Sequence, residues 1–581
     1  MIKYRLKEQG IDIVDTVLTN RGLTVQQVKS ILKPDSSVIE SPYALKNMDK
    51  AVKKVVQAIR ENKSIVIPID SDADGWCSAG QLYHYIRQVL NYENIIYIFH
   101  KNPKAHGFTE HIVKELKNCK AGLVIMADGG CGDEDRRKYQ TVLDNGTEIV
   151  ILDHHPFIGS YQEEVALVNC HQKGDNTNTN LSGAAVVYKF LQALSSELGN
   201  SKEVLRYRDL VALSLVSDLM DLKELENRVL LNEGSVGVNI TSPFIKKIMS
   251  KNKVEEYLSI EELGFSVAPL INATVRMGKT TDKEKVFRSL MGIEELIESE
   301  KRGEKGKGIF VPLEDEAVRI ASNLKSSQDK KRDKAMEELF KREANSLWSG
   351  KVFIADVTDY MDSEISGLVA NKMLDIVNKP ILLIRRDEEK ECYTGSARGL
   401  SESRELPSFK KVCLDTGCFM FCAGHENAFG VGISKNNIEN VKKTLNENLK
   451  NIVFFTGHYI DGEYNKTIPL AHVKAISQYE KLWCNNIKAP LFIVKDVHMG
   501  TDDIEKVGNA TYTFKIGDVK FTKNFGSKKW YEKVIQLEKL PFGGDIIADI
   551  VCKFRKTKKG YYWCDIVDMV SRENDEEVID F

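Results

Sequence analysis

The sequence predicts an α/β protein in which two α/β domains are joined by a long helix and followed by a small β-barrel. Between residues 64 and 220, short apolar runs alternate with amphipathic stretches, and the same alternation returns from about 350 to 450. Strand–helix alternation is typical of a parallel sheet covered by helices. After residue 488 the apolar runs come short and close, separated by turn residues, which is typical of a small barrel.

The composition limits what the chain can be. Its 581 residues allow roughly four domains. Lys and Arg number 82 and Asp and Glu 84, a net charge of −2, which excludes a polycation that binds nucleic acid by bulk charge but not a local basic groove. No apolar run approaches the ~18 residues of a membrane span, so we expect no membrane partner. Eleven cysteines without paired spacing indicate a reduced, cytoplasmic protein.

The predicted elements begin with a helical lead-in over residues 1–60, where apolar side chains recur at helical spacing. Residues 61–312 form the first α/β domain, with a mainly helical extension over 222–290. Its predicted strands are 65–69, 95–99, 123–127 and 149–152, and its predicted helices include 79–90, 110–116 and 183–194.

A long connecting helix is predicted over residues 313–345, because residues 314–344 are charged and apolar at helical period without Gly or Pro. It leads to the second α/β domain, 346–450, and then to a linker over 451–487. The barrel covers 488–570, and an acidic tail covers 571–581. The predicted strands of these parts are 352–357 and 381–385, then 491–494, 512–516, 534–537, 546–554 and 561–567.

Four groups of acids and imidazoles in the first domain share one arrangement, since each follows an apolar run that we interpret as a strand. They are Asp70-Ser-Asp72-Ala-Asp74-Gly75, Asp128-Gly-Gly130, Asp153-His154-His155, and Asp218 near the end of residues 210–216. Sheets of this kind bind ligands at the C-terminal edge of their strands. A lone Asp at a strand end is usually a turn former or helix cap, but four in series predict one shared site.

Carboxylates that converge repel one another, so burying them requires a cation. Mostly oxygen ligands with one or two imidazoles suit Mn²⁺ or Mg²⁺, whereas zinc would favour thiolates and more histidine. Two such ions about 4 Å apart activate a water and brace both oxygens of an in-line displacement at phosphorus. The four groups therefore predict metal-dependent hydrolysis of phosphoesters.

In order and spacing the four groups resemble the motifs of the DHH phosphoesterases, and among these the RecJ-type single-strand-specific exonucleases. Further segments extend the resemblance over nearly the whole chain: Asn20-Arg-Gly22, Leu32-Lys-Pro34, 41–48, 209–213, Glu226-Asn-Arg228 and 268–276. A DHHA1 substrate-binding domain is suggested by 367–370, Gly395-Ser-Ala-Arg398 and Ala423-Gly-His425, and the β-rich end resembles the family's OB-fold. Pro68, Gly129 and Leu270 depart from the family pattern, which indicates a divergent member.

The resemblance implies a role for each matching residue. The implied ligands of two Mn²⁺ or Mg²⁺ ions are Asp70, Asp72, Asp74, Asp128, His154 and Asp218. The implied catalytic residues are Asp72, Asp74, Asp128, His154, His155 and Asp218. His155 fits equally well a residue that fixes the motif through hydrogen bonds. The implied substrate-binding residues are Asn272, Arg276, Ser396, Arg398, Gly424 and His425. Arg398 offers a cationic fork that suits a phosphate, although a surface ion pair would also explain it.

Aromatic and basic residues are interleaved in the predicted barrel. One set is Phe514, Phe521, Phe525, Trp530 and Tyr531 with Lys520, Lys523, Lys528 and Lys529, and another is the run 553–563. Base stacking with phosphate pairing uses this mixture, but barrel core and solvated strand faces would explain it too. The acidic tail resembles the docking tail of single-strand DNA-binding proteins, which suggests such a protein or a helicase as partner; a solvated chain end is the simpler explanation.

The resemblance implies a two-metal exonuclease that removes nucleotides from the 5′ end of single-stranded DNA, in repair, recombination or replication. The 5′ polarity rests on the resemblance alone. A DHH phosphodiesterase for short oligoribonucleotides or cyclic dinucleotides stays open, although such enzymes commonly lack a β-rich module like that after residue 488. A non-catalytic replication scaffold also stays open, but such relatives have lost acidic ligands that this chain keeps.

Overall fold

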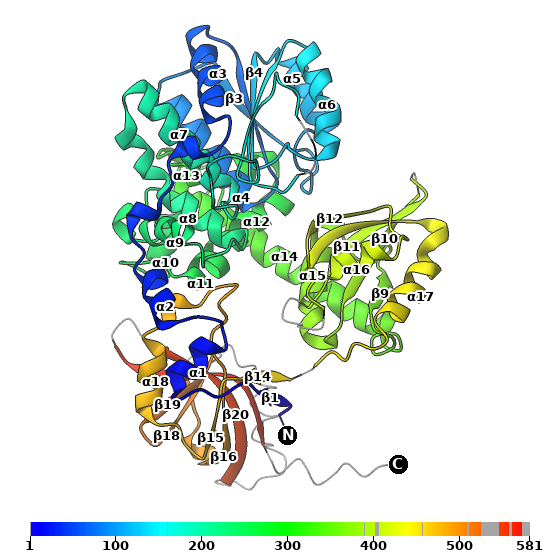
Figure 1. Cartoon of the computed structure of the whole chain (residues 1–581). Coiled ribbons are helices and arrows are strands. Elements are labelled where there is room, and N and C mark those ends of the chain that lie inside the picture. Colours follow the sequence, from blue (N-terminus) through cyan, green and yellow to red (C-terminus); the bar gives the residue numbers. More distant parts are fainter. Residues whose placement is uncertain are drawn as a thin grey trace. The chain divides into compact units, whose positions relative to one another are not determined.

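The computed structural model describes residues 2–157, 159, 161–388, 390–400, 406–455, 457–507, 511–524, 545–556 and 560–571. The chain divides into two compact units (Figure 1). One consists of Met1–Ile39, Asp221–Val229 and Thr456–Phe581, and the other of Glu40–Met220 and Leu230–Phe455. The segment Met1–Ile39, which we grouped with residues 40–60, thus belongs with the C-terminal part of the chain.

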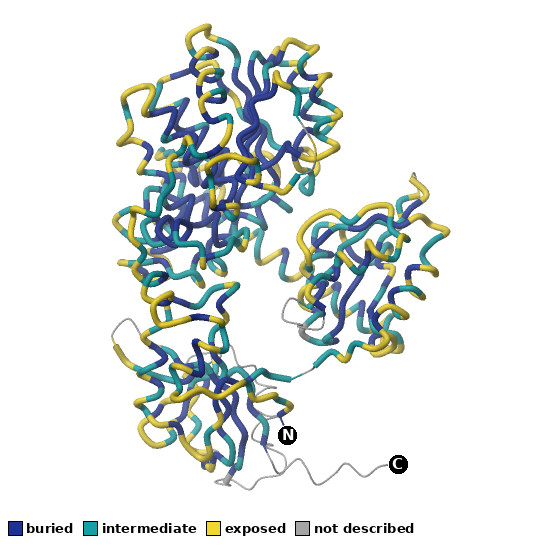
Figure 2. Tube along the Cα trace, in the orientation of Figure 1, coloured by how far each residue is buried: buried dark blue, intermediate teal, exposed yellow. Residues whose placement is uncertain are grey.

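The larger unit begins with a five-stranded parallel sheet of order β3-β2-β4-β5-β6. Four strands are those predicted, and β6 was not predicted: β2 (Ile65–Ile69), β3 (Ile95–Phe99), β4 (Leu123–Ala127), β5 (Glu148–Asp153) and β6 (Ala166–Asn169). Helices flank the sheet: α3 (Met48–Arg60), α4 (Ala73–His84), α5 (Glu110–Asn118), α6 (Asp133–Asp144) and α7 (Gly183–Leu198). Because they cover the sheet, β2 and β4 are buried at every position, as the dark-blue strands of Figure 2 show.

Residues 210–216 form part of helix α8 (Arg208–Ser217), so our interpretation of this run as a strand is wrong. Nearly every residue of the helix is buried. A helix buried on all sides lacks a polar face, and its sequence cannot be told from a buried strand by periodicity alone. Asp218 is the C-cap residue of α8. The helical extension that follows contains α9 (Leu225–Gly234), α10 (Pro243–Lys251), α11 (Ile260–Glu262), α12 (Ala268–Met277) and α13 (Thr280–Met291).

A short hairpin, β7 (Leu296–Glu298) and β8 (Phe310–Pro312), precedes helix α14 (Leu313–Glu343), which confirms the predicted long helix. The second sheet is mixed: β9 and β10 are parallel, and the other neighbours are antiparallel. Its order is β12-β13-β11-β10-β9. Its strands are β9 (Phe353–Asp356), β10 (Ile381–Asp387), β11 (Cys392–Arg398), β12 (Phe421–His425) and β13 (Ala428–Ser434), with helices α15 (Ser363–Val377), α16 (Phe409–Asp415) and α17 (Ile438–Asn448).

The smaller unit opens with strand β1 (Tyr4–Leu6), where we expected only helices; β1 pairs with β14 (His458–Ile460). Helices α1 (Ile13–Thr19), α2 (Val25–Leu32) and α18 (Leu470–Ser477) accompany a seven-stranded sheet of order β15-β16-β20-β21-β19-β18-β17. Its strands are β15 (Gly462–Asn465), β16 (Phe492–Gly500), β17 (Glu505–Val507), β18 (Thr511–Ile516), β19 (Val519–Lys523), β20 (Asp545–Lys556) and β21 (Tyr562–Ser571).

The described part of this sheet has two free edges, β15 and β17, so it is not a closed barrel there. Phe514, Phe521 and Phe554 are buried in its core, which confirms the packing explanation for these three aromatics. The predicted strand 534–537, the residues Phe525, Lys528, Lys529, Trp530 and Tyr531, and the acidic tail from residue 572 lie outside the described residues. Within the described ranges, no helix combines the length and the apolar character that a bilayer crossing requires.

Candidate metal centre

The acidic motif after β2 places three carboxylates at the start of helix α4. Asp70 follows the strand directly, and Asp72 is the N-cap residue, which accepts a hydrogen bond from the Gly75 amide at 2.9 Å. Gly75 is needed here because a Cβ atom would lie 2.4 Å from the Cβ of Asp70. Asp74 accepts hydrogen bonds from two consecutive amides at the start of α7, each 2.8 Å long. Two helix N-termini therefore meet at this cluster of acids, where their dipoles favour negative charge.

Asp128 follows β4 and reaches the same place from the neighbouring strand. Its backbone has a φ of 59°, a conformation that is uncommon outside glycine and that often marks functional positions. A Cβ atom on Gly183 would lie 2.5 Å from Asp128 Oδ1. Glycine at position 183 therefore lets the N-terminus of α7 approach this carboxylate closely.

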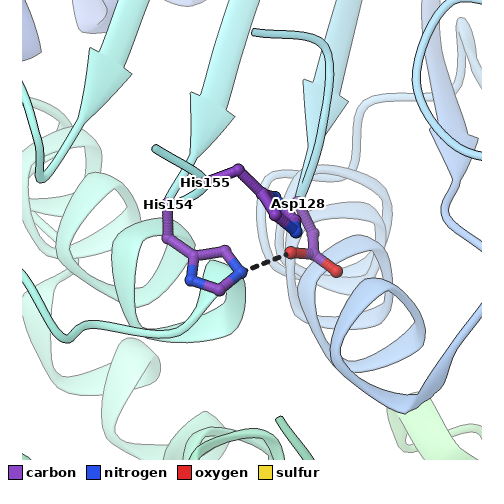
Figure 3. Close-up of side chains that lie close together, drawn as sticks. All are labelled: Asp128, His154 and His155. Carbon is purple, nitrogen blue, oxygen red and sulfur yellow. Dashed lines mark ion pairs between the residues drawn. The ribbon is translucent and has the colours of Figure 1, made fainter. Parts of the chain in front are cut away.

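The third motif ends β5 with Asp153 and turns two imidazoles toward Asp128 (Figure 3). The Asp153 carboxylate accepts a hydrogen bond from His155 Nδ1 at 2.9 Å and others from the His154 and His155 amides, so it fixes the turn. His154 Nε2 lies 3.2 Å from Asp128 Oδ1, 3.5 Å from Asp218 Oδ2 and 3.8 Å from Asp74 Oδ2. The imidazole of His154 is thus the centre of a ring of three carboxylates.

The residues of this ring fit a bound cation. His154 Nε2, Asp128 Oδ1 and Asp218 Oδ2 are buried and have no hydrogen-bond partner among the described residues. Buried polar atoms are nearly always paired, and unpaired ones often mark the place of a water or an ion. Two sets bring their ligand atoms within 4.8 Å of one another, namely Asp74, His154 and Asp218, and Asp128, His154 and His155. Carboxylate oxygens with an imidazole match the donors that Mn²⁺ accepts.

The pKa shifts of the carboxylates also indicate that this site binds a cation. Burial raises the pKa values of Asp128 and Asp218 well above the usual value, and repulsion from Asp74 adds to both. Burial, followed by repulsion from Asp72, raises the pKa of Asp74 to about 6. Ionised carboxylates at these positions therefore need positive charge from outside the cluster, which a divalent cation supplies.

The two imidazoles of the third motif differ in the direction in which their pKa values are shifted. Burial lowers the pKa of His154 to about 3, so its ring is neutral and offers a lone pair. Burial would also lower the pKa of His155, but the charge and hydrogen bond of Asp153 outweigh it and raise the pKa to about 10. Asp153 therefore favours the protonated form of His155.

Two further histidines adjoin Asp70, and we did not single them out from the sequence. His106, in the loop after β3, has Nδ1 2.5 Å from Asp70 Oδ2. Asp70, Asp72 and His106 form a third set with ligand atoms within 4.8 Å of one another. His100 directly follows β3, and its Nε2 lies 3.9 Å from Asp70 Oδ1. The rule that led to the other motifs, applied to residues 95–99, would have pointed to His100.

Three cations form a second cluster in the larger unit. Arg276 on α12 donates a hydrogen bond to the Pro103 carbonyl at 2.8 Å, and Arg398 at the end of β11 donates one to Asn371 at 2.7 Å. Burial, with repulsion from Arg276, lowers the pKa of Arg398 to about 10 and that of Lys104 to about 8. Lys104 was missed by our sequence reasoning. The mutual repulsion of these cations would be relieved by a bound anion.

The other residues expected to bind substrate are spread around these clusters. His425 Nε2 lies 4.0 Å from Asp218 Oδ1. Gly424 has a φ of 126°, and a Cβ atom there would lie 2.8 Å from the Ala428 carbonyl oxygen. Ser396 on β11 shares a hydrogen bond of 2.9 Å with Ser366, and Asn272 is half-buried on α12. The structure therefore places His425 near the ring of carboxylates around His154. It places Arg276 and Arg398 in one cationic cluster. Asn272 makes no hydrogen bond or ion pair with either group among the described residues.

Comparison with known proteins places these motifs in a wider group. Residues 64–215 match the DHH family, N-terminal domain. A putative prophage-derived single-strand DNA-specific exonuclease of Bacillus subtilis (strain 168), YorK, is 30% identical over 92% of this chain and 92% of its own length. The single-stranded-DNA-specific exonuclease RecJ of the same organism is 26% identical over 75% of this chain and 52% of its own length.

Solved structures show the same fold. The structure of RecJ in complex with Mn²⁺ from Thermus thermophilus has a TM-score of 0.68 and 17% identity, and the match covers 98% of this chain and 79% of that chain. A second structure of that protein, in complex with Mg²⁺, has a TM-score of 0.64 and 16% identity, with coverage of 98% and 78%. The fold of this chain is therefore similar to one seen before in a protein bound to a metal.

Proposed function

We propose that this chain, which belongs to the RecJ-like branch of the DHH family, is a metal-dependent exonuclease that hydrolyses single-stranded DNA from its 5′ end. The observation that carries the proposal is the ring of buried atoms on Asp128, His154 and Asp218 that have no hydrogen-bond partner among the described residues. It lies in a chain related to YorK over most of its length. The direction of hydrolysis, and a place in repair, recombination or replication, are inferred from the RecJ-like relatives.

Two ions, Mn²⁺ or Mg²⁺, would be held by Asp70, Asp72, Asp74, Asp128, His154 and Asp218. When bound there, they would lower the pKa of a water enough to supply a hydroxide and would offset the charge that develops on the phosphate. His154, neutral because it is buried, presents a lone pair to this site. We assign His155 a positioning role, because the Asp153 carboxylate holds its ring through a hydrogen bond to Nδ1.

The strand would be held by the cationic cluster and by the residues near the acidic ring. Arg398 and Arg276 present guanidinium forks that suit phosphate oxygens, and Lys104 adds a third positive charge. His425, whose Nε2 lies 4.0 Å from Asp218 Oδ1, would contact the phosphate that is cut. Gly424 keeps the backbone beside His425 open to the strand, while Ser396 and Asn272 would line its path.

We also propose the domain roles that the family suggests. Residues 61–312 would be the DHH catalytic domain, 346–450 the DHHA1 domain that binds substrate, and 488–570 an OB-fold that guides the strand. Exposed bases on the described strands of the smaller unit, Lys515 and Lys520, suit contacts with phosphates. A cytoplasmic location and a single-strand DNA-binding protein or helicase as partner belong to the same proposal.

A labelled length series tests the function. Single and double strands of DNA and RNA, labelled at the 5′ or the 3′ end, would be incubated with the full chain and either Mn²⁺ or Mg²⁺. We expect mononucleotides from the 5′ end of long single-stranded DNA. Cleavage of dinucleotides without cleavage of long strands would instead support a phosphodiesterase for short oligoribonucleotides or cyclic dinucleotides, and strand binding without hydrolysis would support a scaffold.

A further inference from the structure

We propose that His106 is a metal ligand and that it completes, with Asp70 and Asp72, an ion site distinct from the ring around His154. Each of the two ions would then have one imidazole among its ligands. The inference rests on the proposed function for the presence of the ions, and it adds a ligand and a metal preference to it.

The contact between His106 and Asp70 carries the proposal. His106 Nδ1 lies 2.5 Å from Asp70 Oδ2, and the Asp70 side chain is 1% exposed whereas that of His106 is 53% exposed. With Asp72, these residues bring one ligand atom each within 4.8 Å of one another. Since His106 comes from the loop after β3 and the two acids from the loop after β2, the set joins two neighbouring strands at their C-terminal ends.

The loop that carries His106 is held in place by other residues. Gly107 has a φ of 62°, and a Cβ atom there would lie 2.4 Å from Asp135 Oδ1. Asp135 accepts a hydrogen bond from the Phe108 amide at 2.6 Å. Gly107 permits this turn and Asp135 anchors it, so the conformation of the loop is fixed and His106 is held next to Asp70.

A second observation points to an ion at the same carboxylate. The side chain of His100 is 1% exposed, its Nε2 lies 3.9 Å from Asp70 Oδ1, and neither ring nitrogen has a hydrogen-bond partner among the described residues. A buried imidazole without a partner is costly, and such groups are found where water or an ion binds. Asp70 thus has an imidazole near each of its two oxygens.

The relation of His106 to Asp70 parallels that of His154 to Asp128. In both pairs a ring nitrogen faces a buried carboxylate oxygen at the end of a central strand, at 2.5 Å and 3.2 Å. Mg²⁺ prefers oxygen ligands and strict octahedral geometry, whereas transition metals accept imidazole readily. An imidazole in each set would therefore favour Mn²⁺ over Mg²⁺.

The test measures ion binding without DNA, in full-length variants. His106→Asn keeps a hydrogen-bond donor near Asp70 but removes the imidazole. His106→Lys places a positive charge near Asp70 without an imidazole, and His111→Asn on α5 is the matched control. Titration calorimetry counts the Mn²⁺ ions bound and their affinities. We expect two ions for the natural chain and the control. Both His106 variants should bind one ion at least about tenfold more weakly, because even residues that only orient a ligand change metal affinity by about 10- to 100-fold.

Pulsed EPR distinguishes a ligand from a residue that only neutralises Asp70. In a His154→Asn background, nitrogen coupling to bound Mn²⁺ should persist, and adding His106→Asn should remove it while His111→Asn does not. Unchanged nitrogen coupling, or a His106→Lys chain that binds two Mn²⁺ ions as tightly as the natural chain, would overturn the proposal. A chain that binds Mn²⁺ through His106 but cuts no strand would overturn only the proposed function.

Discussion

Two clusters of the larger unit carry opposite charge, and each is unfavourable by itself. At the acidic ring, burial and mutual repulsion raise the pKa values of Asp74, Asp128 and Asp218. At the cationic cluster, burial and mutual repulsion lower the pKa values of Lys104 and Arg398. Each cluster therefore disfavours its own charged groups.

The difference in sign indicates what each cluster needs. The acids need a cation and the bases need an anion, and both partners come from outside the chain. A divalent metal and a phosphodiester strand would supply them together, which is why the two clusters suit one reaction. Substitutions confined to one cluster should therefore separate metal binding from strand binding.

The largest effect is expected from His154→Ala, at the centre of the acidic ring. Without the imidazole, the three carboxylates would bind the ion more weakly. The kcat/KM for single-stranded DNA with Mn²⁺ should therefore fall by more than about 100-fold. Release of labelled mononucleotide measures it, with the exposed His498→Ala as control. Activity within threefold of the natural chain would show that the ring does not hold the catalytic metal.

In the cationic cluster, Arg398→Ala should raise KM for single-stranded DNA by about 10- to 100-fold, because it removes a charged hydrogen bond to phosphate. Arg398→Lys should recover part of the loss, because it keeps the charge but not the fork. Affinity for Mn²⁺, measured by calorimetry, should stay unchanged. A fall in kcat at constant KM would mean that Arg398 acts on the reacting phosphate instead of holding the strand.

A smaller effect is expected on stability. Because the pKa of Asp218 is raised above its unfolded value of 3.8, its protonated form favours folding at low pH, and this contribution is lost as the pH rises. In EDTA at pH 7.5, Asp218→Asn should therefore melt about 2–4 °C higher than the natural chain, and the gap should close toward pH 4. Exposed Asp175→Asn serves as control.

With saturating Mn²⁺, the natural chain should instead melt at a higher temperature than Asp218→Asn, since it binds the ion more tightly and is stabilised by it. Thermal unfolding followed by circular dichroism measures both conditions. If Asp218→Asn melted at a lower temperature than the natural chain in EDTA, the Asp218 carboxylate would be stabilised by a partner within the protein. It would then not depend on a metal for its charge.

The smallest effect is expected from Ser396→Ala. Its hydroxyl is already shared with Ser366 at 2.9 Å, so the variant should change KM by about twofold or less, as is usual away from critical contacts. Strand-binding measurements by fluorescence anisotropy would check it. A tenfold loss would place the Ser396 hydroxyl directly on the strand.

Much of the fold and of the acidic ring could be predicted from the sequence, because buried parallel strands are short apolar runs and their ligands follow them directly. Residues 65–69, 95–99 and 123–127 are strands with the predicted bounds. Asp218 was expected in the ring for the wrong reason, since it follows a buried helix whose sequence has the same apolar character as a strand.

Long-range partners could not be predicted in this way. His106 lies in the loop after β3, and only the order of strands in the sheet brings it to Asp70. Lys104 joins Arg276 and Arg398 from elements far apart in the sequence. The pairing of β1 with β14 joins two segments about 450 residues apart, and local periodicity carries no signal for such contacts.

The most direct test of the account is Asp128→Asn, which removes one charge from the acidic ring and leaves the cationic cluster intact. Hydrolysis of 5′-labelled single-stranded DNA and binding of the same strand would be measured on one preparation with Mn²⁺. We predict that hydrolysis is lost and that the dissociation constant for the strand changes by less than about threefold. Unchanged hydrolysis in Asp128→Asn would contradict the assignment of the ring as the metal centre.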